Sequence, residues 1–161
     1  MTIDEKQYED ILNRFIPKYI GRVFTVEGCP VPLIGDDIKH HIKDCKKLLI
    51  SAATLGSEFD KTLRQLQLED MAGAFILDRL SGKRLHKFCC EKDCEVLELS
   101  SVVANSNAVG FSPRYGDFPL SVNREIVTVL DASKKIGICV LDSFMLTPQK
   151  SITRIVGIRS N

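Results

Sequence analysis

Apolar residues recur at helical spacing in several segments of the chain. The spacing predicts a first helix that begins at a Thr-x-x-Glu capping box at Thr2 and ends near Pro17. A longer helix is predicted over 69–88, with Met71 and Phe75 among its buried side chains. Shorter helices are predicted to begin near residues that favour helix starts, which are Asp36, Ser57 and Pro119.

Other apolar segments predict strands. The run over 47–54 is bounded by charges and by Gly56, which is typical of a strand that is buried on both faces. Segment 23–31 is broken by Gly28 and Pro30, so we interpret it as irregular or as an edge strand. Further strands are predicted over 96–104, 136–141 and 151–158. Helices and strands mix without a regular βαβ order, which predicts the α+β class, with a mixed or mainly antiparallel sheet flanked by helices.

The composition is ordinary for a soluble globular domain. The chain has 161 residues, of which 44% are hydrophobic and 27% charged, and it shows no internal repeat or linker, so we expect a single domain over 1–161. The 22 Lys and Arg residues balance the 21 Asp and Glu residues, which gives no charge excess to attract nucleic acid or a membrane surface. The sequence offers no membrane-spanning or signal-peptide pattern. We therefore expect a cytoplasmic protein whose six cysteines are thiols or metal ligands.

One loop stands out by its composition. The segment 111–119 combines rigid turn formers with one tyrosine, one arginine and one aspartate in nine residues, which is typical of a loop that holds a polar ligand against backbone amides. The candidate ligand-binding residues are Ser112, Pro113, Arg114, Tyr115 and Gly116.

The same loop also has an interpretation without a ligand. In that case Tyr115 packs on the sheet, Arg114 is solvated, and Asp117 caps the helix that begins at Pro119. For Asp117 we favour the cap, and for Tyr115 we favour ligand contact.

Taken in order and spacing, four motifs resemble the activation domain of cobalamin-dependent methionine synthase, and more closely the short stand-alone proteins that carry this domain. The motifs are Ala53-Thr-Leu-Gly56, Phe111-Ser-Pro-Arg-Tyr-Gly-Asp-Phe-Pro-Leu120, Ile136-Gly137 and Pro148-Gln-Lys-Ser-Ile152. The resemblance covers 36–157, which leaves an N-terminal helix and an irregular or edge-strand segment in 1–35.

The resemblance implies a role in methionine biosynthesis. It implies that the domain binds S-adenosylmethionine and presents it for reductive methylation of cob(II)alamin. The cobalamin would be carried by a methionine synthase or a related corrinoid methyltransferase, and an electron donor protein would supply the electron. The resemblance also implies no turnover by the isolated chain. The chemistry of the loop is compatible with this ligand, because Tyr115 can offer an aromatic face to the sulfonium and the planar guanidinium of Arg114 can pair with the ligand carboxylate.

Three positions depart from the family pattern. The family loop usually begins with an arginine where this chain has Gly110, and it has a glycine where this chain has Arg114. By approximate alignment, His86 stands where the family carries a glutamate. These departures support an alternative hypothesis, in which the chain docks on the corrinoid protein but has lost S-adenosylmethionine binding.

A second cluster suggests a metal. His86, Cys89, Cys90 and Cys94 supply four nitrogen and sulfur ligands, the number that a tetrahedral zinc site uses, and an iron–sulfur cluster is a further chemical option. On a helix, His86 lies one turn from Cys89 and Cys90. The simpler interpretation is a set of reduced thiols at a helix end, because the spacing matches no common ligand pair. A metal- or cluster-binding protein is thus the third functional hypothesis.

Overall fold

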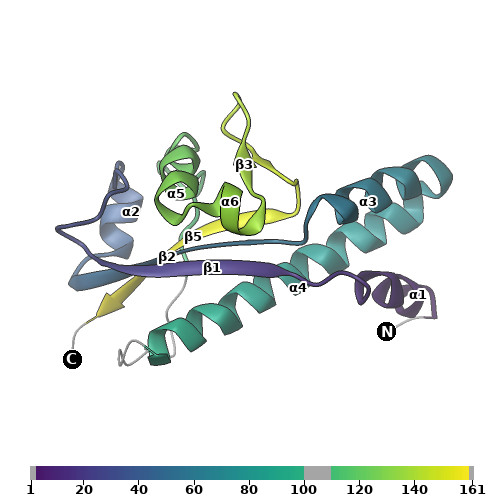
Figure 1. The fold of residues 1–161 in the computed structure, drawn as a ribbon, viewed down its shortest axis with the longest axis horizontal. Helices are drawn as coiled ribbons and strands as arrows, with labels where there is room; N and C mark the ends of the chain where they lie inside the picture. Colours follow the sequence, from purple (N-terminus) through teal and green to yellow (C-terminus); the bar gives the residue numbers. More distant parts are fainter. Residues whose placement is uncertain (1–2, 100–109, 160–161) are drawn as a thin grey trace.

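The structure is a computed structural model that describes residues 3–99 and 110–159. Within these two stretches the chain forms six helices and five strands (Figure 1). The helices are α1 (Ile3–Leu12), α2 (Asp36–His41), α3 (Ser57–Glu69), α4 (Met71–Leu99), α5 (Val122–Leu130) and α6 (Ala132–Ile136). The strands are β1 (Lys18–Thr25), β2 (Cys45–Thr54), β3 (Cys139–Val140), β4 (Leu146–Thr147) and β5 (Ser151–Arg159).

The central sheet contains β1, β2 and β5, with β2 in the middle. Both neighbours run antiparallel to β2, and Ala53 pairs with Tyr19 on one side and with Ile152 on the other. A separate short hairpin joins β3 and β4. In Figure 1 the sheet lies between the long helix α4 on one side and α5 and α6 on the other. The predicted α+β class is confirmed, and both described sheets are antiparallel.

The middle strand β2 is buried on both faces, as predicted. Leu48 and Ile50 pack with α2, α5 and α6 in one apolar core. Leu49 and Ala53 point the other way, toward cores built with α1, α3 and α4. Since successive strand residues face opposite sides, one continuous apolar run supplies both cores.

The N-terminal strand and helix differ from the prediction in their bounds. α1 ends at Leu12, and β1 begins directly after Pro17, five residues before the predicted segment 23–31. β1 lies at the edge of the sheet, which agrees with the edge-strand interpretation of segment 23–31 over the residues that the two share. The expected capping residue Thr2 lies outside the described residues.

α4 is longer than predicted, and two of the side chains that were expected to be buried face the solvent. It runs to Leu99, so the strand predicted over 96–104 is wrong over its first four residues, and the rest lies outside the described residues. Leu97 is buried at helical spacing against the sheet, which explains why its apolar neighbourhood looked strand-like. Met71 and Phe75 were expected in the core but are 69% and 72% exposed.

Three smaller expectations are also corrected. α3 is preceded by Gly56, and Ser57 is its first residue and makes no capping hydrogen bond. α5 begins at Val122, after a turn that follows Pro119. In place of a strand over 136–141, Ile136 ends α6 and only β3 is extended. Among the described helices, none is both long and apolar enough to cross a bilayer.

Candidate functional site

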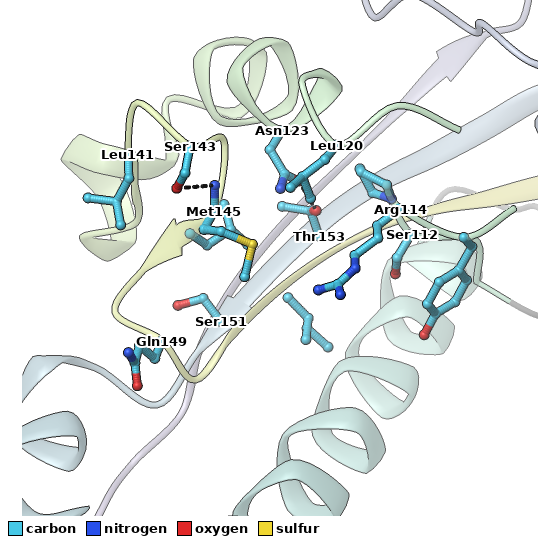
Figure 2. A pocket seen from close by; sticks show the side chains of 14 residues that line it. Ser112, Arg114, Leu120, Asn123, Leu141, Ser143, Met145, Gln149, Ser151 and Thr153 are labelled. Atoms are coloured by element: carbon cyan, nitrogen blue, oxygen red, sulfur yellow. Dashed lines mark hydrogen bonds between the residues drawn. The ribbon is translucent and has the colours of Figure 1, made fainter. Parts of the chain in front are cut away.

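A pocket of about 510 Å³ lies between the loop after Gly110, the start of α5, the β3–β4 hairpin and the first residues of β5. Figure 2 shows side chains from all four segments around the same space. Four of the five predicted ligand-binding residues line it, namely Ser112, Pro113, Arg114 and Tyr115. The fifth, Gly116, is not part of the pocket lining.

The floor of the pocket is the open edge of β5. Phe111 and Ile155 exchange backbone hydrogen bonds of 2.8 Å each, which brings the loop onto this edge at a single bridge. The consecutive residues Ser151, Ile152 and Thr153 all line the pocket. Because consecutive strand residues point to opposite faces, this lining places the backbone edge of β5 against the pocket. Backbone N–H and C=O groups there are suited to bind a polar ligand.

A polar network holds the wall opposite the loop. Buried Asn123 on α5 accepts a hydrogen bond from Thr153 Oγ1 at 2.7 Å and donates one from Nδ2 to the carbonyl of Phe144 at 2.9 Å. One amide thus joins α5, β5 and the β3–β4 turn. Nearby, the backbone N–H of Gln149 donates to Asp60 at 2.7 Å, which fixes the approach to β5.

Only some of the residues in these walls could be predicted from the sequence. The motif over 148–152 includes Gln149, Ser151 and Ile152, so its resemblance pointed to this region. Asn123 and Thr153 were missed, since a polar residue inside an apolar helix or strand shows its partner only once the fold is known.

The loop is held to α2 by reciprocal hydrogen bonds, which we call the aspartate clasp (Asp36, Asp37 and Asp117). The carboxylate of Asp117 accepts the backbone N–H groups of Asp36 at 2.7 Å and Asp37 at 2.9 Å. In return, the carboxylate of Asp37 accepts the N–H of Asp117 at 3.0 Å. The N–H donors of Asp37 and Asp36 lower the pKa of the Asp117 carboxyl. Asp117 is therefore a helix cap. The sequence predicted that it caps the helix after Pro119, but in the structure it caps α2.

Two glycines allow α2 and the pocket loop to approach each other closely enough for the hydrogen bonds of the aspartate clasp to form. Gly116 has φ of +55° and Gly35 has φ of +115°, both in the region that favours glycine. A Cβ on Gly116 would overlap the Asp37 carboxylate, and one on Gly35 would lie 2.6 Å from Asp117 Oδ1. Gly116 thus has a structural role in positioning the pocket loop.

Arg114 takes the positive φ that its place in the turn requires. Its φ is +84°, although arginine pays about 1 kcal/mol or more for this conformation. The backbone of the turn therefore keeps a glycine-like shape while carrying a cation. Figure 2 shows the guanidinium of Arg114 pointing into the pocket. Among the lining residues, all of which lie in the described stretches, Arg114 is the one with a charged side chain.

An aromatic series connects α2 with the pocket. The ring of His41 packs on Phe111 with centroids 5.2 Å apart, and Phe111 contacts Tyr115 edge-on at 5.8 Å. Burial lowers the pKa of His41, and the positive charge of Arg154 lowers it further. A backbone hydrogen bond at Ile155 opposes this shift in part, and the net effect is that His41, which packs on the residue that anchors the loop, takes up a proton less readily than a free imidazole.

The side chain of Arg154 occupies the space beside Gly110. A Cβ at position 110 would overlap the guanidinium of Arg154. Arg154 itself is buried and faces α4, where its Nε lies 3.5 Å from Asp93 Oδ2. It does not line the pocket, so it supplies no positive charge there.

The predicted metal ligands do not converge. Cys89 is buried and faces Ser51, with the two side-chain atoms 3.9 Å apart. Cys90 contacts His86 Nδ1 at 3.8 Å, and Cys94 is exposed. In the part of the chain that the structure describes, no group of three or more His, Cys, Asp or Glu side chains is arranged to hold a metal ion. Helical spacing separates these residues because neighbours in sequence point in different directions.

Comparisons with known proteins identify the fold. No profile of a known protein family matches this chain, and no curated protein matches its sequence. Among solved structures, one described as the MetH reactivation domain bound to AdoHcy is similar, with a TM-score of 0.59 at 16% sequence identity. The match covers 97% of this chain and 64% of that chain, so this chain spans less than two thirds of the solved domain. At this identity the likeness establishes the shared fold.

The aspartate clasp predicts an unequal response at two glycines that both have positive φ. Gly137 has φ of +76° and open space around it, so Gly137→Ala should cost only the backbone strain, about 1 kcal/mol of unfolding free energy. Gly116→Ala adds the overlap with Asp37 and should cost roughly 2–3 kcal/mol. Urea unfolding of the two variants measures the difference. Equal losses would show that the clasp does not constrain the loop.

His41 predicts a stability change with pH. Its pKa in the folded state lies below that of the unfolded chain, so the unfolded state takes up a proton first as the pH falls. The contribution of His41 is present above the unfolded pKa, about 6.5, and is lost as the pH falls through the folded pKa. Urea unfolding at pH 7.5 and 5.5 should show a smaller loss for His41→Gln than for the wild type. The exposed neighbour offers the control His40→Gln, which should behave as wild type, whereas a wild-type response of His41→Gln would contradict the assignment.

Proposed function

We propose that this chain is a module that binds S-adenosylmethionine in the pocket beside β5 and presents it to a corrinoid-bearing methionine synthase or related methyltransferase. The observation that carries the proposal is the position of Ser112–Tyr115 on the pocket wall, in a fold shared with a domain solved with AdoHcy. The composition of the loop by itself predicts that these residues bind a polar ligand.

The pocket suits the chemistry of this ligand. Its volume of about 510 Å³ lies in the range of small-molecule sites, roughly 300–1,000 Å³. The guanidinium of Arg114 can pair with the ligand carboxylate, and the edge of β5 can pair with the purine through backbone groups. Leu120 and Leu146 supply an apolar wall, and Tyr115 supplies an aromatic face that attracts a sulfonium.

The rim of the pocket supports docking of a partner. Tyr115, Leu141 and Met145 line the pocket and are 55%, 49% and 44% exposed. Exposed apolar side chains that cluster around a pocket are typical of a surface covered by another molecule. We infer that the face of a protein-bound corrinoid approaches this rim.

The chemistry is then divided between the proteins. The partner's cob(II)alamin would be the substrate: a donor protein would supply one electron and S-adenosylmethionine the methyl group, so that AdoHcy would be left in the pocket. This chain binds and orients the methyl donor, and its apolar rim excludes water once the partner is docked. The isolated chain should therefore not turn over.

A second candidate function follows from one observation at position 110. The guanidinium of Arg154 blocks any side chain at Gly110, and His86 points toward Cys90. Neither position can then supply the charged contact that the family resemblance implies. The second candidate is a module that docks on the corrinoid protein through the same rim without binding S-adenosylmethionine.

Calorimetric titration separates the two candidates and tests Arg114. The first candidate predicts that the wild-type chain binds S-adenosylmethionine and AdoHcy with millimolar or tighter dissociation constants. Arg114→Ala should weaken binding at least tenfold, because a charge-assisted hydrogen bond contributes about 1.5–3 kcal/mol. Arg64→Ala, an exposed arginine on α3 outside the pocket, is the matched control and should bind as wild type.

Arg114→Gly keeps the turn while removing the cation. It should bind as weakly as Arg114→Ala and yet unfold with about 1 kcal/mol more free energy than the wild type, since glycine relieves the positive φ. No heat from folded wild-type protein would reject the first candidate in favour of the second. Full affinity in Arg114→Ala would reject the assigned role of Arg114 alone.

A further inference from the structure

Cys90 lies in a polar cluster that the pocket does not use. Nη1 of Arg154 donates a hydrogen bond to Cys90 Sγ at 2.8 Å, and Nδ1 of His86 lies 3.8 Å from the same sulfur. Cys90 is only partly buried, so small reagents can reach it. A thiol, an imidazole and a guanidinium therefore meet at one point on α4 and β5.

The guanidinium is fixed beside the sulfur by its surroundings. The Arg154 side chain is 6% exposed, and Asp93 Oδ2 lies 3.5 Å from its Nε. Tyr19 donates to the other carboxylate oxygen of Asp93 at 2.5 Å, which anchors Asp93 in turn. Nε of Arg154 has no hydrogen-bond acceptor among the described residues. The buried Arg154 cation is thus held beside Asp93 through Nε and directs Nη1 toward Cys90.

The neighbouring cysteines provide contrasts within the same chain. Cys89 is buried, and burial raises its pKa to about 12, so it should be inert toward polar reagents. Cys94 and Cys139 are exposed, but neither accepts a hydrogen bond from a cationic side chain in the described stretches. Cys29 and Cys45 are partly buried, and burial raises the pKa of both thiols even though Arg159 lies beside Cys45. Cys90 combines partial exposure with a hydrogen bond from the buried guanidinium of Arg154.

We propose that Cys90 is a thiol-exchange site that reacts with small disulfides. The sulfur of Cys90 attacks one sulfur of RSSR, the S–S bond of the reagent breaks, and a mixed disulfide forms on the protein. The thiol proton passes to His86 and then to the departing RS⁻, which leaves as RSH. Arg154 stabilises the negative charge on the attacking sulfur, as cations do beside reactive cysteines.

The adduct would form close to the start of the pocket loop. The Cα of Gly110 lies against the Arg154 guanidinium that holds Cys90. The proposal itself does not depend on which ligand the pocket binds, because none of Cys90, His86 and Arg154 lines the pocket.

The test measures thiol exchange of the native chain with 4,4′-dithiodipyridine, followed by peptide mass spectrometry of the quenched product. We expect one fast phase that maps to Cys90 and is at least about tenfold faster than the reaction of Cys94 or Cys139. Cys90→Ser should remove this phase, and the matched variant Cys94→Ser should retain it. Mapping in the wild type requires no variant to fold.

His86→Gln tests the role of the imidazole. It should slow the fast phase several-fold in the native chain but leave the rate in denaturant unchanged, which separates proton transfer from a structural effect. A fast phase that maps to Cys94 or Cys139, equal rates at all accessible thiols, or a fast phase that survives in Cys90→Ser would each overturn the proposal.

Discussion

The aspartate clasp determines where the pocket loop lies. The carboxylates of Asp37 and Asp117 each bind backbone N–H groups of the other's segment, so α2 and the loop are joined through short, charge-assisted hydrogen bonds. Beyond the clasp, the loop bridges to β5 at Phe111, and between these two attachments Ser112–Tyr115 must arch over the open edge of the sheet. The loop is attached at both ends, and between them its own backbone hydrogen bonds fix its shape, from Tyr115 N–H to Ser112 and from Arg114 N–H to Phe118.

This arrangement explains the unusual residues of the loop. Gly116 is required for close approach to Asp37, whereas Arg114 tolerates a positive φ at a cost in stability. Strain of this kind persists where neighbouring structure fixes the backbone, and here it directs the one charged side chain of the lining into the pocket. At the other end of the loop, Arg154 fills the space beside Gly110.

The sequence could predict the parts of this fold that depend on local pattern. The apolar run of β2 and the strand β5 each carry their signal within about ten residues, and both were predicted. The composition of segment 111–119 also drew attention to a loop whose residues line the pocket, while ligand binding there stays a prediction. Contacts distant in sequence carried no such signal. Asp117 looked like a cap for the helix that follows it, but its partners lie 80 and 81 residues earlier, on α2. The end of α4 was taken for a strand because buried helical and strand residues such as Leu97 look alike in short windows.

The most direct test of the central claim is an amide NMR titration of the labelled chain with AdoHcy. The account predicts that chemical shifts change for Ser112, Arg114 and Tyr115 on the loop and for 151–153 on β5, while the amides of Leu68 and Cys90 do not move. These two residues lie outside the pocket, at the end of α3 and in the middle of α4. An unchanged spectrum at millimolar ligand, or shifts confined to the region where α3 meets α4, would contradict the claim that this pocket binds an S-adenosyl ligand.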